Sequence, residues 1–307
     1  MSEGQDTVWG ADLELGIGTW AWGDRWFWQY GSSYTEADVE AAFRASLEGG
    51  VHLFDTAELY GWGTSEKLLG RFLADTGRPV QVIAKFLPVP WRLTRSSLLR
   101  ALRASLERLG LEHVDLYLVH HPWPPVSVET WMEALADAVE AGLARHVGIS
   151  NYNLARMERA QEALARRGVP LAANQVQYSL LHRAPERNGL LAACQARGVR
   201  LIAYSPLGQG LLTGKYTPED PPPGVRRWIY GRDRLERVQS LVGLLRAIGE
   251  AHSKTPVQVA LNWTIAKGTL PIPGAKDRRQ AEENAGAAGW RLTDDEVDRL
   301  DAASTNL

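Results

Sequence analysis

Short apolar runs alternate with longer amphipathic stretches along almost the whole chain. The short runs are rich in aliphatic and β-branched residues, and they predict eight strands at 13–19, 51–55, 80–85, 116–120, 146–150, 171–175, 200–205 and 270–272. The longer stretches repeat apolar residues at helical spacing and predict helices at 36–48, 65–74, 96–109, 128–141, 154–167, 187–196, 257–266 and 278–287. Eight repeats of a strand followed by a helix are typical of an α/β fold, the (β/α)8 TIM barrel.

The regular alternation breaks once, after the seventh strand. Residues 208–230 hold several glycines together with Pro218, Pro221, Pro222 and Pro223, and a further helical pattern follows near 235–252. A last helix begins after Thr293, whose side chain can cap it. We therefore expect one barrel domain over residues 1–307, with a flexible start at 1–10, an insertion after strand seven and an extra C-terminal helix.

Composition and charge exclude several classes of protein. Hydrophobic residues make up 45% of the chain and charged residues 23%, and no apolar run approaches the ~18 residues that a membrane helix needs. The 34 basic and 36 acidic residues give a net charge of −2, which provides no general attraction to nucleic acid or to membranes. The polar, acidic start lacks the pattern of a secretory signal or transit peptide, so we expect a cytoplasmic protein.

Four polar residues follow or end three successive predicted strands: Asp55, Tyr60, Lys85 and His120. In a barrel of this type the carboxyl ends of the strands carry the chemistry, so we expect these side chains to converge. An ammonium group beside a phenol lowers the phenol's pKa, and a carboxylate keeps a buried lysine charged. The combination predicts a general acid that protonates an oxygen, as must happen when hydride is delivered to a carbonyl.

Other kinds of site fit the sequence less well. Adjacent strand residues point to opposite faces, so we expect only one of His120 and His121 to face the pocket, and we expect no metal site. A Gly-x-Ser-x-Gly elbow, typical of α/β hydrolases, is absent, as is a Gly-x-Gly-x-x-Gly dinucleotide fingerprint. An isomerase that uses Lys85 as a Schiff base remains an alternative.

Seven motifs, in order along the chain, resemble the landmarks of the aldo-keto reductases, in particular a bacterial and plastid branch that includes pyridoxal reductase-like proteins. They are Gly16-Ile-Gly-Thr-Trp20, Phe54-Asp-Thr-Ala-Glu-Leu-Tyr-Gly61, Val114-Asp-Leu-Tyr-Leu-Val-His120, Gly148-Ile-Ser-Asn-Tyr152, Asn174-Gln-Val-Gln-Tyr178, Ala203-Tyr-Ser-Pro-Leu207 and Ile272-Pro-Gly-Ala-Lys276. The resemblance implies a barrel that binds NADPH or NADP+, with NADH possible, and that reduces a small aldehyde or ketone. It also implies that Asp55, Tyr60, Lys85 and His120 form the catalytic tetrad.

The same resemblance implies the residues that bind the cofactor. Ser150, Asn151 and Gln175 would hydrogen-bond the nicotinamide carboxamide, and Tyr204 would stack on its ring. Lys276, before the last barrel helix, would bind the 2′-phosphate, although Gln280 stands where many relatives have an arginine. The remaining expected contacts are Thr19, Trp20, Ser205, Pro206, Leu207, Gly208, Gly210, Lys215, Gly274, Glu283 and Asn284.

Several further assignments are open from the sequence. The chain has 12 tryptophans, and among those at or after strand ends we expect Trp22, Trp91 and Trp123 to line the substrate pocket. Arg226 and Arg227 in the insertion have no assigned role. The physiological carbonyl and the oligomeric state are not identified. A regulatory or redox-sensing subunit that binds NADP(H) with little turnover is the alternative to an enzyme.

Overall fold

Eight parallel strands form a closed barrel in the computed structural model, which describes residues 13–305 and 307. Each strand pairs with the next one in the chain, and a bridge between Gly18 and Gly274 joins the last strand to the first. The strands are β1 Ile17–Gly18, β2 Leu53–Asp55, β3 Gln81–Phe86, β4 Val114–Val119, β5 Ala144–Ser150, β6 Leu171–Gln177, β7 Arg200–Tyr204 and β8 Leu270–Ile272. The predicted (β/α)8 fold is confirmed.

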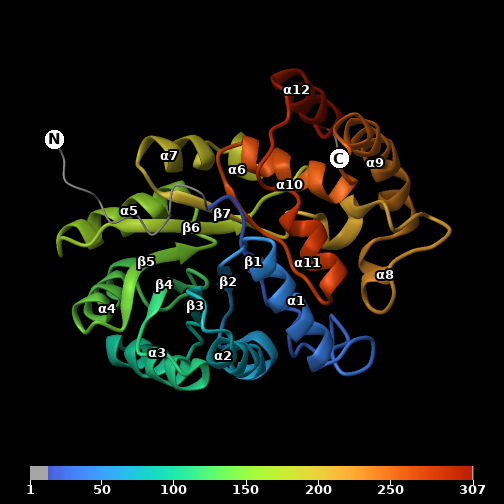
Figure 1. Ribbon diagram of the computed structural model, residues 1–307. Coiled ribbons are helices and arrows are strands. Elements are labelled where there is room, and N and C mark those ends of the chain that lie inside the picture. Colours follow the sequence, from blue (N-terminus) through green and yellow to red (C-terminus); the bar gives the residue numbers. More distant parts are fainter. Residues whose placement is uncertain (1–12, 306) are drawn as a thin grey trace.

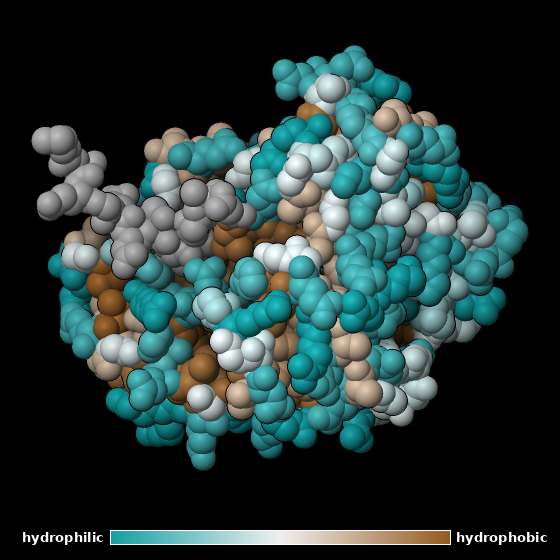
Figure 2. Space-filling view, viewed as in Figure 1, coloured by the Kyte–Doolittle hydropathy of each residue, from teal (hydrophilic) through white to brown (hydrophobic). Residues whose placement is uncertain are grey.

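Helices surround the barrel, as Figure 1 shows. They are α1 Glu36–Glu48, α2 Thr64–Thr76, α3 Arg95–Leu109, α4 Val128–Glu140, α5 Leu154–Ala165, α6 Ala184–Arg187, α7 Leu190–Ala196, α8 Arg226–Ile229, α9 Arg232–His252, α10 Pro256–Ala266, α11 Arg278–Ala285 and α12 Asp294–Ala303. Hydrophilic side chains cover much of the face seen in Figure 2, and hydrophobic ones show mainly in the gaps between them. Among the described helices, none is long and apolar enough to cross a membrane.

Some element boundaries differ from the predicted ones. The first strand is two residues long. Gly16, directly before it, allows close packing, since a Cβ atom there would lie 2.8 Å from Cδ2 of Leu53. The helix predicted at 187–196 is divided into α6 and α7 by Gly189, whose φ of 78° is left-handed. The predicted flexible segment 1–10 lies outside the described residues.

The insertion after β7 contains the short helix η2 Gly208–Thr213, then α8 and the long helix α9. Helix α9 contacts η2 as well as α10 and the C-terminal helix α12, which lies beside it in Figure 1. The insertion and the C-terminal helix are therefore joined to one side of the barrel.

The strand period of two explains how polar groups come to lie above an apolar barrel interior. Leu53, Ile83, Leu118 and Ile202 belong to the buried cluster inside the barrel. Two residues after each of them come Asp55, Lys85, His120 and Tyr204. Because side chains two apart on a strand share a face, the apolar residues form a floor and the polar residues lie on it at the carboxyl edge.

Asn262 on α10 is a fully buried polar residue that holds the chain between α11 and α12. Its amide nitrogen donates to the carbonyl oxygens of Ala287 and Trp290, at 3.0 and 2.9 Å, and its Oδ1 accepts from the amide of Leu292 at 3.0 Å. These bonds satisfy three backbone groups that lie outside regular helix or strand. The side chain therefore serves as a structural connector.

We expect Asn262→Leu to lower the free energy of unfolding by about 3 kcal/mol, because buried backbone groups would lose their partners. Urea denaturation monitored by circular dichroism measures the change. Lys67→Leu on the exposed face of α2 is the control, and it should change stability by less than about 0.5 kcal/mol. Equal stabilities of the two variants would contradict this role of Asn262.

Candidate active site

A buried ion pair lies at the carboxyl edge of the barrel. Nζ of Lys85 at the end of β3 lies 2.5 Å from Oδ1 of Asp55 at the end of β2, and it also donates to the carbonyl oxygen of Thr56 at 2.9 Å. The second carboxylate oxygen of Asp55 accepts from the side-chain amide of Gln175 at 2.7 Å. Both charged side chains are almost completely enclosed. The pair is therefore held by hydrogen bonds from three strands.

The third member of this group is Tyr60, in the short helix η1 Tyr60–Gly63 that follows β2. Nζ of Lys85 lies 3.3 Å from its hydroxyl oxygen and 4.8 Å from its ring centre. Because the lysine donates to the phenol oxygen, the phenol's own proton is free to point into the cavity.

The direction of the Tyr60 pKa corrects the expectation from the sequence. We expected the ammonium group of Lys85 to lower it. Instead, burial and the negative charge of Asp55 raise the Tyr60 pKa well above its usual value. The buried ammonium and carboxylate largely offset one another, so desolvation dominates. The neutral phenol, which is the form that can give a proton, is strongly favoured.

His120 lies across from Tyr60, with the two rings edge to face and their centres 5.9 Å apart. Burial, and then the charge of Lys85, lower the pKa of His120 well below its usual value, so the ring is neutral. Its Nδ1 atom is enclosed and has no hydrogen-bond partner among the described residues. The other ring nitrogen is therefore the one available to a ligand.

Both consecutive histidines face the cavity, contrary to the expectation that only one would. The rings of His120 and His121 stack at 4.9 Å, with 8° between their planes, and both belong to the cavity wall. The expectation was wrong because β4 ends at Val119. The amide of His120 still donates to the carbonyl oxygen of Phe86 on β3, but His121 lies beyond the strand, so strand alternation does not govern its direction. Among the described residues, no group of three or more His, Cys, Asp or Glu side chains is arranged to hold a metal ion.

A cavity of about 880 Å³ opens at this edge of the barrel. Asp55, Tyr60 and His120 line one part of it, while Lys85 lies behind the wall. The residues expected to bind the cofactor also line the cavity, except Thr19 and Gly208. Thr19 is buried and donates to the carbonyl oxygen of Asp55, and Gly208 begins η2. The predicted set is thus brought together in one continuous space.

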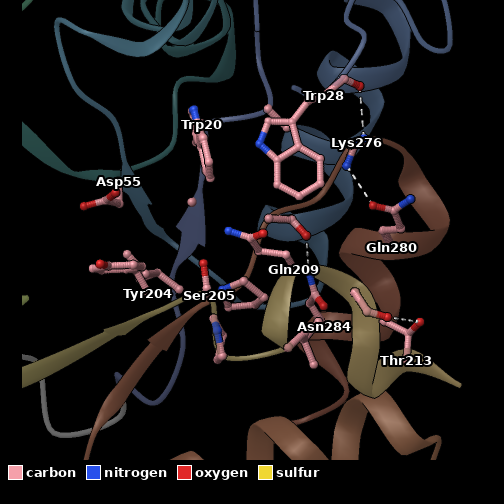
Figure 3. A pocket seen from close by; sticks show the side chains of 18 of the residues that line it. Trp20, Trp28, Asp55, Tyr204, Ser205, Gln209, Thr213, Lys276, Gln280 and Asn284 are labelled. Atoms are coloured by element: carbon pink, nitrogen blue, oxygen red, sulfur yellow. Dashed lines mark hydrogen bonds between the residues drawn. The ribbon is translucent and has the colours of Figure 1, made fainter. Parts of the chain in front are cut away.

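Amide and hydroxyl groups lie near the catalytic end of the cavity. The side-chain nitrogen of Asn151 donates to the carbonyl oxygen of His120 at 3.0 Å and to the hydroxyl of Ser150 at 3.1 Å. Its oxygen accepts from the hydroxyl of Tyr204 at 3.0 Å. Figure 3 shows Tyr204 and Ser205 on the side of the cavity opposite Trp20. These groups offer donors and acceptors, together with an aromatic face, to a flat amide-bearing ring.

Three cations gather around the other end of the cavity. Lys215, Arg226 and Lys276 all belong to its wall, and none of them forms a salt bridge within the described residues. Burial, and then the charges of Arg226 and Lys215, lower the pKa of Lys276 to about 8. Positive groups that destabilise one another in this way need an anion, and they suit the phosphates of a nucleotide.

Two cations of this group, the buried Arg226 and the partly buried Lys276, rest on aromatic rings. Lys276 lies 4.5 Å from the ring centre of Trp28 and 4.7 Å from that of Tyr34, and its Nζ donates to the carbonyl oxygen of Trp28 (Figure 3). The guanidinium carbon of Arg226 lies 5.0 Å from the ring centre of Trp28 and 5.6 Å from that of Tyr216. Cation–π contacts hold charged groups where water cannot fully solvate them.

The start of α11 forms the far end of the cavity. The carboxamide of Gln280 accepts from the backbone amide of Lys276 at 3.2 Å and donates to Asp277 at 2.9 Å. Asn284 donates to the carbonyl oxygen of Gly274 at 3.2 Å, and Glu283 pairs with Arg279. All of these side chains line the cavity, so this helix supplies a polar surface at the end remote from Tyr60.

None of the three tryptophans expected in the substrate pocket lies on the cavity wall. Trp22 is fully buried against Phe54 and Phe72, and its ring nitrogen donates to the carbonyl oxygen of Ala275. Trp91 and Trp123 are exposed. Trp20 and Trp28, from the loop between β1 and α1, provide the indole rings of the wall instead (Figure 3).

Sequence reasoning also left out wall residues that the fold brings in. Arg226 had no assigned role, yet only 6% of it is exposed, whereas Arg227 is exposed. The one sequence signal for Arg226 was its place, next to Arg227, in the insertion after strand seven. His121 was set aside on strand alternation, and Tyr34 gave no signal before the loop structure was known.

Comparison with known proteins agrees with this architecture. The model of the Aldo/keto reductase family matches residues 14–305. Chloroplastic pyridoxal reductase from Arabidopsis thaliana is 41% identical, and the match covers 94% of this chain and 82% of that protein. The structure of glycerol dehydrogenase from Gluconobacter oxydans is 25% identical in sequence, with a TM-score of 0.82. The match covers 94% of this chain and 90% of that chain.

An aldo/keto reductase from Klebsiella pneumoniae, solved with NADP and acetate, is 27% identical, with a TM-score of 0.73 and the same coverage. The family match spans nearly all of the described chain. The 41% sequence identity to the relative from Arabidopsis is well above the level at which common descent is in doubt. This chain therefore belongs to the aldo/keto reductase family.

Proposed function

We propose that the protein is an NADP(H)-dependent reductase that converts an aldehyde or ketone to an alcohol by hydride transfer, with Tyr60 as the general acid. The observation that carries this proposal is the contact between Lys85 and the hydroxyl of Tyr60 at the cavity wall. An ammonium group that donates to a phenol oxygen stabilises the phenolate that forms when the phenol gives up its proton. Family membership supports the reaction class.

The chain's own residues fit a phosphate-bearing dinucleotide. Lys215, Arg226 and Lys276 lie at one end of the cavity, while the amides of Asn151 and Gln175 lie near Tyr60. We assign the phosphates to the cationic end and the carboxamide of the nicotinamide to the amide end. When bound, NADPH would supply the hydride. The Klebsiella relative, which was solved with NADP, supports this choice of cofactor.

The proton would come from Tyr60. Its high pKa keeps the phenol protonated until an oxygen that is gaining negative charge lies close to it. After the transfer, the ammonium group of Lys85, 3.3 Å away, would stabilise the phenolate. Asp55 keeps that ammonium charged and in place, and Gln175 holds the carboxylate. In this scheme the ion pair stabilises the state formed by proton transfer.

His120 would bind the carbonyl oxygen from the other side. Because the ring is neutral and Nδ1 is enclosed, the second ring nitrogen can donate a hydrogen bond without adding a positive charge near Lys85. A donor aimed at an oxygen that gains charge stabilises the transition state more than the ground state.

The wall near Tyr60 favours an aromatic aldehyde. The ring centre of Trp20 lies 6.4 Å from that of Tyr60, and both residues belong to the cavity wall, as does Leu59. Flat apolar surfaces of this kind bind flat rings well. Pyridoxal is a candidate, because the relative from Arabidopsis is a pyridoxal reductase. A screen of pyridoxal, aromatic and aliphatic aldehydes with NADPH and NADH would identify the preferred class.

We expect Tyr60→Phe to lower kcat for aldehyde reduction by about 10²- to 10⁴-fold, because the general acid is lost. The dissociation constant for NADPH should stay within about twofold, since the phosphate contacts remain. Steady-state NADPH oxidation and fluorescence titration measure the two quantities. Tyr117→Phe is the matched control and should keep kcat, because Tyr117 is buried and lies off the cavity wall.

Full activity of Tyr60→Phe would contradict the role assigned to Tyr60. Tight NADPH binding by the wild type with negligible turnover of every aldehyde would instead favour the alternative of a redox-sensing subunit. Trapping of substrate on Lys85 by borohydride would favour the Schiff-base alternative.

Binding of NADPH should weaken as the pH rises through about 8, because free Lys276 then loses its proton. Binding of phosphate favours charged Lys276, so the dissociation constant should rise by about fivefold between pH 8 and pH 9. Fluorescence titration across this range measures the slope. Lys276→Met should bind NADPH weakly with no such slope, and a slope that survives this substitution would contradict the assignment.

A further inference from the structure

His121 has no role in the proposed reaction, yet it lies beside the catalytic residues. Its ring stacks on that of His120, with ring centres 4.9 Å apart, and on that of Trp123, with ring centres 4.5 Å apart. The angle between the ring planes is 8° in the first stacked pair and 4° in the second. The imidazole is therefore held between two rings, and its edge, which carries both nitrogens, is what it can present to the cavity.

The nitrogens of His121 are available to a ligand. Neither forms a hydrogen bond with another described residue, although the ring belongs to the cavity wall. Burial and the charge of Lys85 lower the pKa of His121, so at neutral pH the ring has one donor and one acceptor. Elsewhere on this wall, the side chain of Leu59 offers no hydrogen bond, and the indole of Trp20 offers one donor and no acceptor. A polar edge beside apolar side chains favours a ligand that carries a polar group at that place.

We propose that His121 determines substrate specificity by hydrogen bonding a hydroxyl group on the ring of an aromatic aldehyde, ortho or meta to the formyl group. The inference rests on the proposed function, because it requires the carbonyl oxygen to lie between Tyr60 and His120. The ring centre of His121 lies 4.9 Å from that of His120, so a polar substituent close to the formyl group would come next to His121. Pyridoxal carries a hydroxyl beside its formyl group and fits this description.

The test compares pairs of substrates of almost equal size: 2-hydroxybenzaldehyde with 2-methylbenzaldehyde, and 3-hydroxybenzaldehyde with 3-methylbenzaldehyde. The ratio of kcat/KM within each pair is measured for the wild type and for His121→Phe. Because the electronic effects of the substituents are the same for both enzymes, the change in the ratio reports the hydrogen bond. We expect the hydroxyl preference of at least one pair to fall by about threefold to tenfold.

Two further variants separate hydrogen bonding from structure. His121→Asn keeps a donor and an acceptor and should retain part of the hydroxyl preference. His113→Phe makes the same substitution before the amino end of β4, remote from the cavity, and should leave both ratios unchanged. Unchanged benzaldehyde turnover in His121→Phe would show that the fold and the catalytic group are intact.

The outcomes distinguish this inference from the proposed function. If the wild type and His121→Phe reduce all of these aldehydes with the same two ratios, the role of His121 is overturned while the proposed function stands. If the wild type reduces no aldehyde with NADPH, both fail. A loss of turnover on every substrate alike, with the ratios unchanged, would also overturn the specificity role.

Discussion

The buried ion pair between Lys85 and Asp55 is the interaction on which the site depends. Removing two charges from water is costly, and their attraction offsets this cost only when the geometry is good and the other hydrogen-bonding positions are filled. Here the backbone of Thr56, the hydroxyl of Tyr60 and the amide of Gln175 fill them. The pair therefore requires three strands and one loop to be correctly placed, and it links the catalytic group to strands β2, β3 and β6 of the barrel.

The positions of these polar groups follow from the pattern of the strands. Apolar residues fill the barrel interior, and the polar residues two positions later extend from the same face at the carboxyl edge. The resemblance of seven motifs to a known family indicated about half of the residues that line the cavity. The pattern of the sequence itself could predict the barrel and the convergence of Asp55, Lys85 and His120. These are the parts of the protein in which a strict period governs which way a side chain points.

The remaining features depend on tertiary contacts that no local pattern records. Two histidines share the wall because β4 ends one residue before them. Arg226 is buried because the insertion folds back on Trp28 and Tyr216. Trp22 enters the core, although its position after a strand suggested the pocket. The sign of the Tyr60 pKa shift was also misjudged, since it depends on how completely the phenol is buried.

The two ends of the cavity have different functions in the proposed reaction: proton transfer at Tyr60 and phosphate binding at Lys276. One end has neutral acids and donors, and the other has cations whose repulsion is relieved by an anion. Label transfer most directly tests the claim that the cavity joins a hydride donor to a carbonyl above Tyr60. The protein would be given benzaldehyde and NADPH deuterated at the transferable position of the nicotinamide, and the alcohol analysed by NMR. The account predicts one deuterium on the carbinol carbon, and alcohol formed without it, or no alcohol at all, would contradict the account.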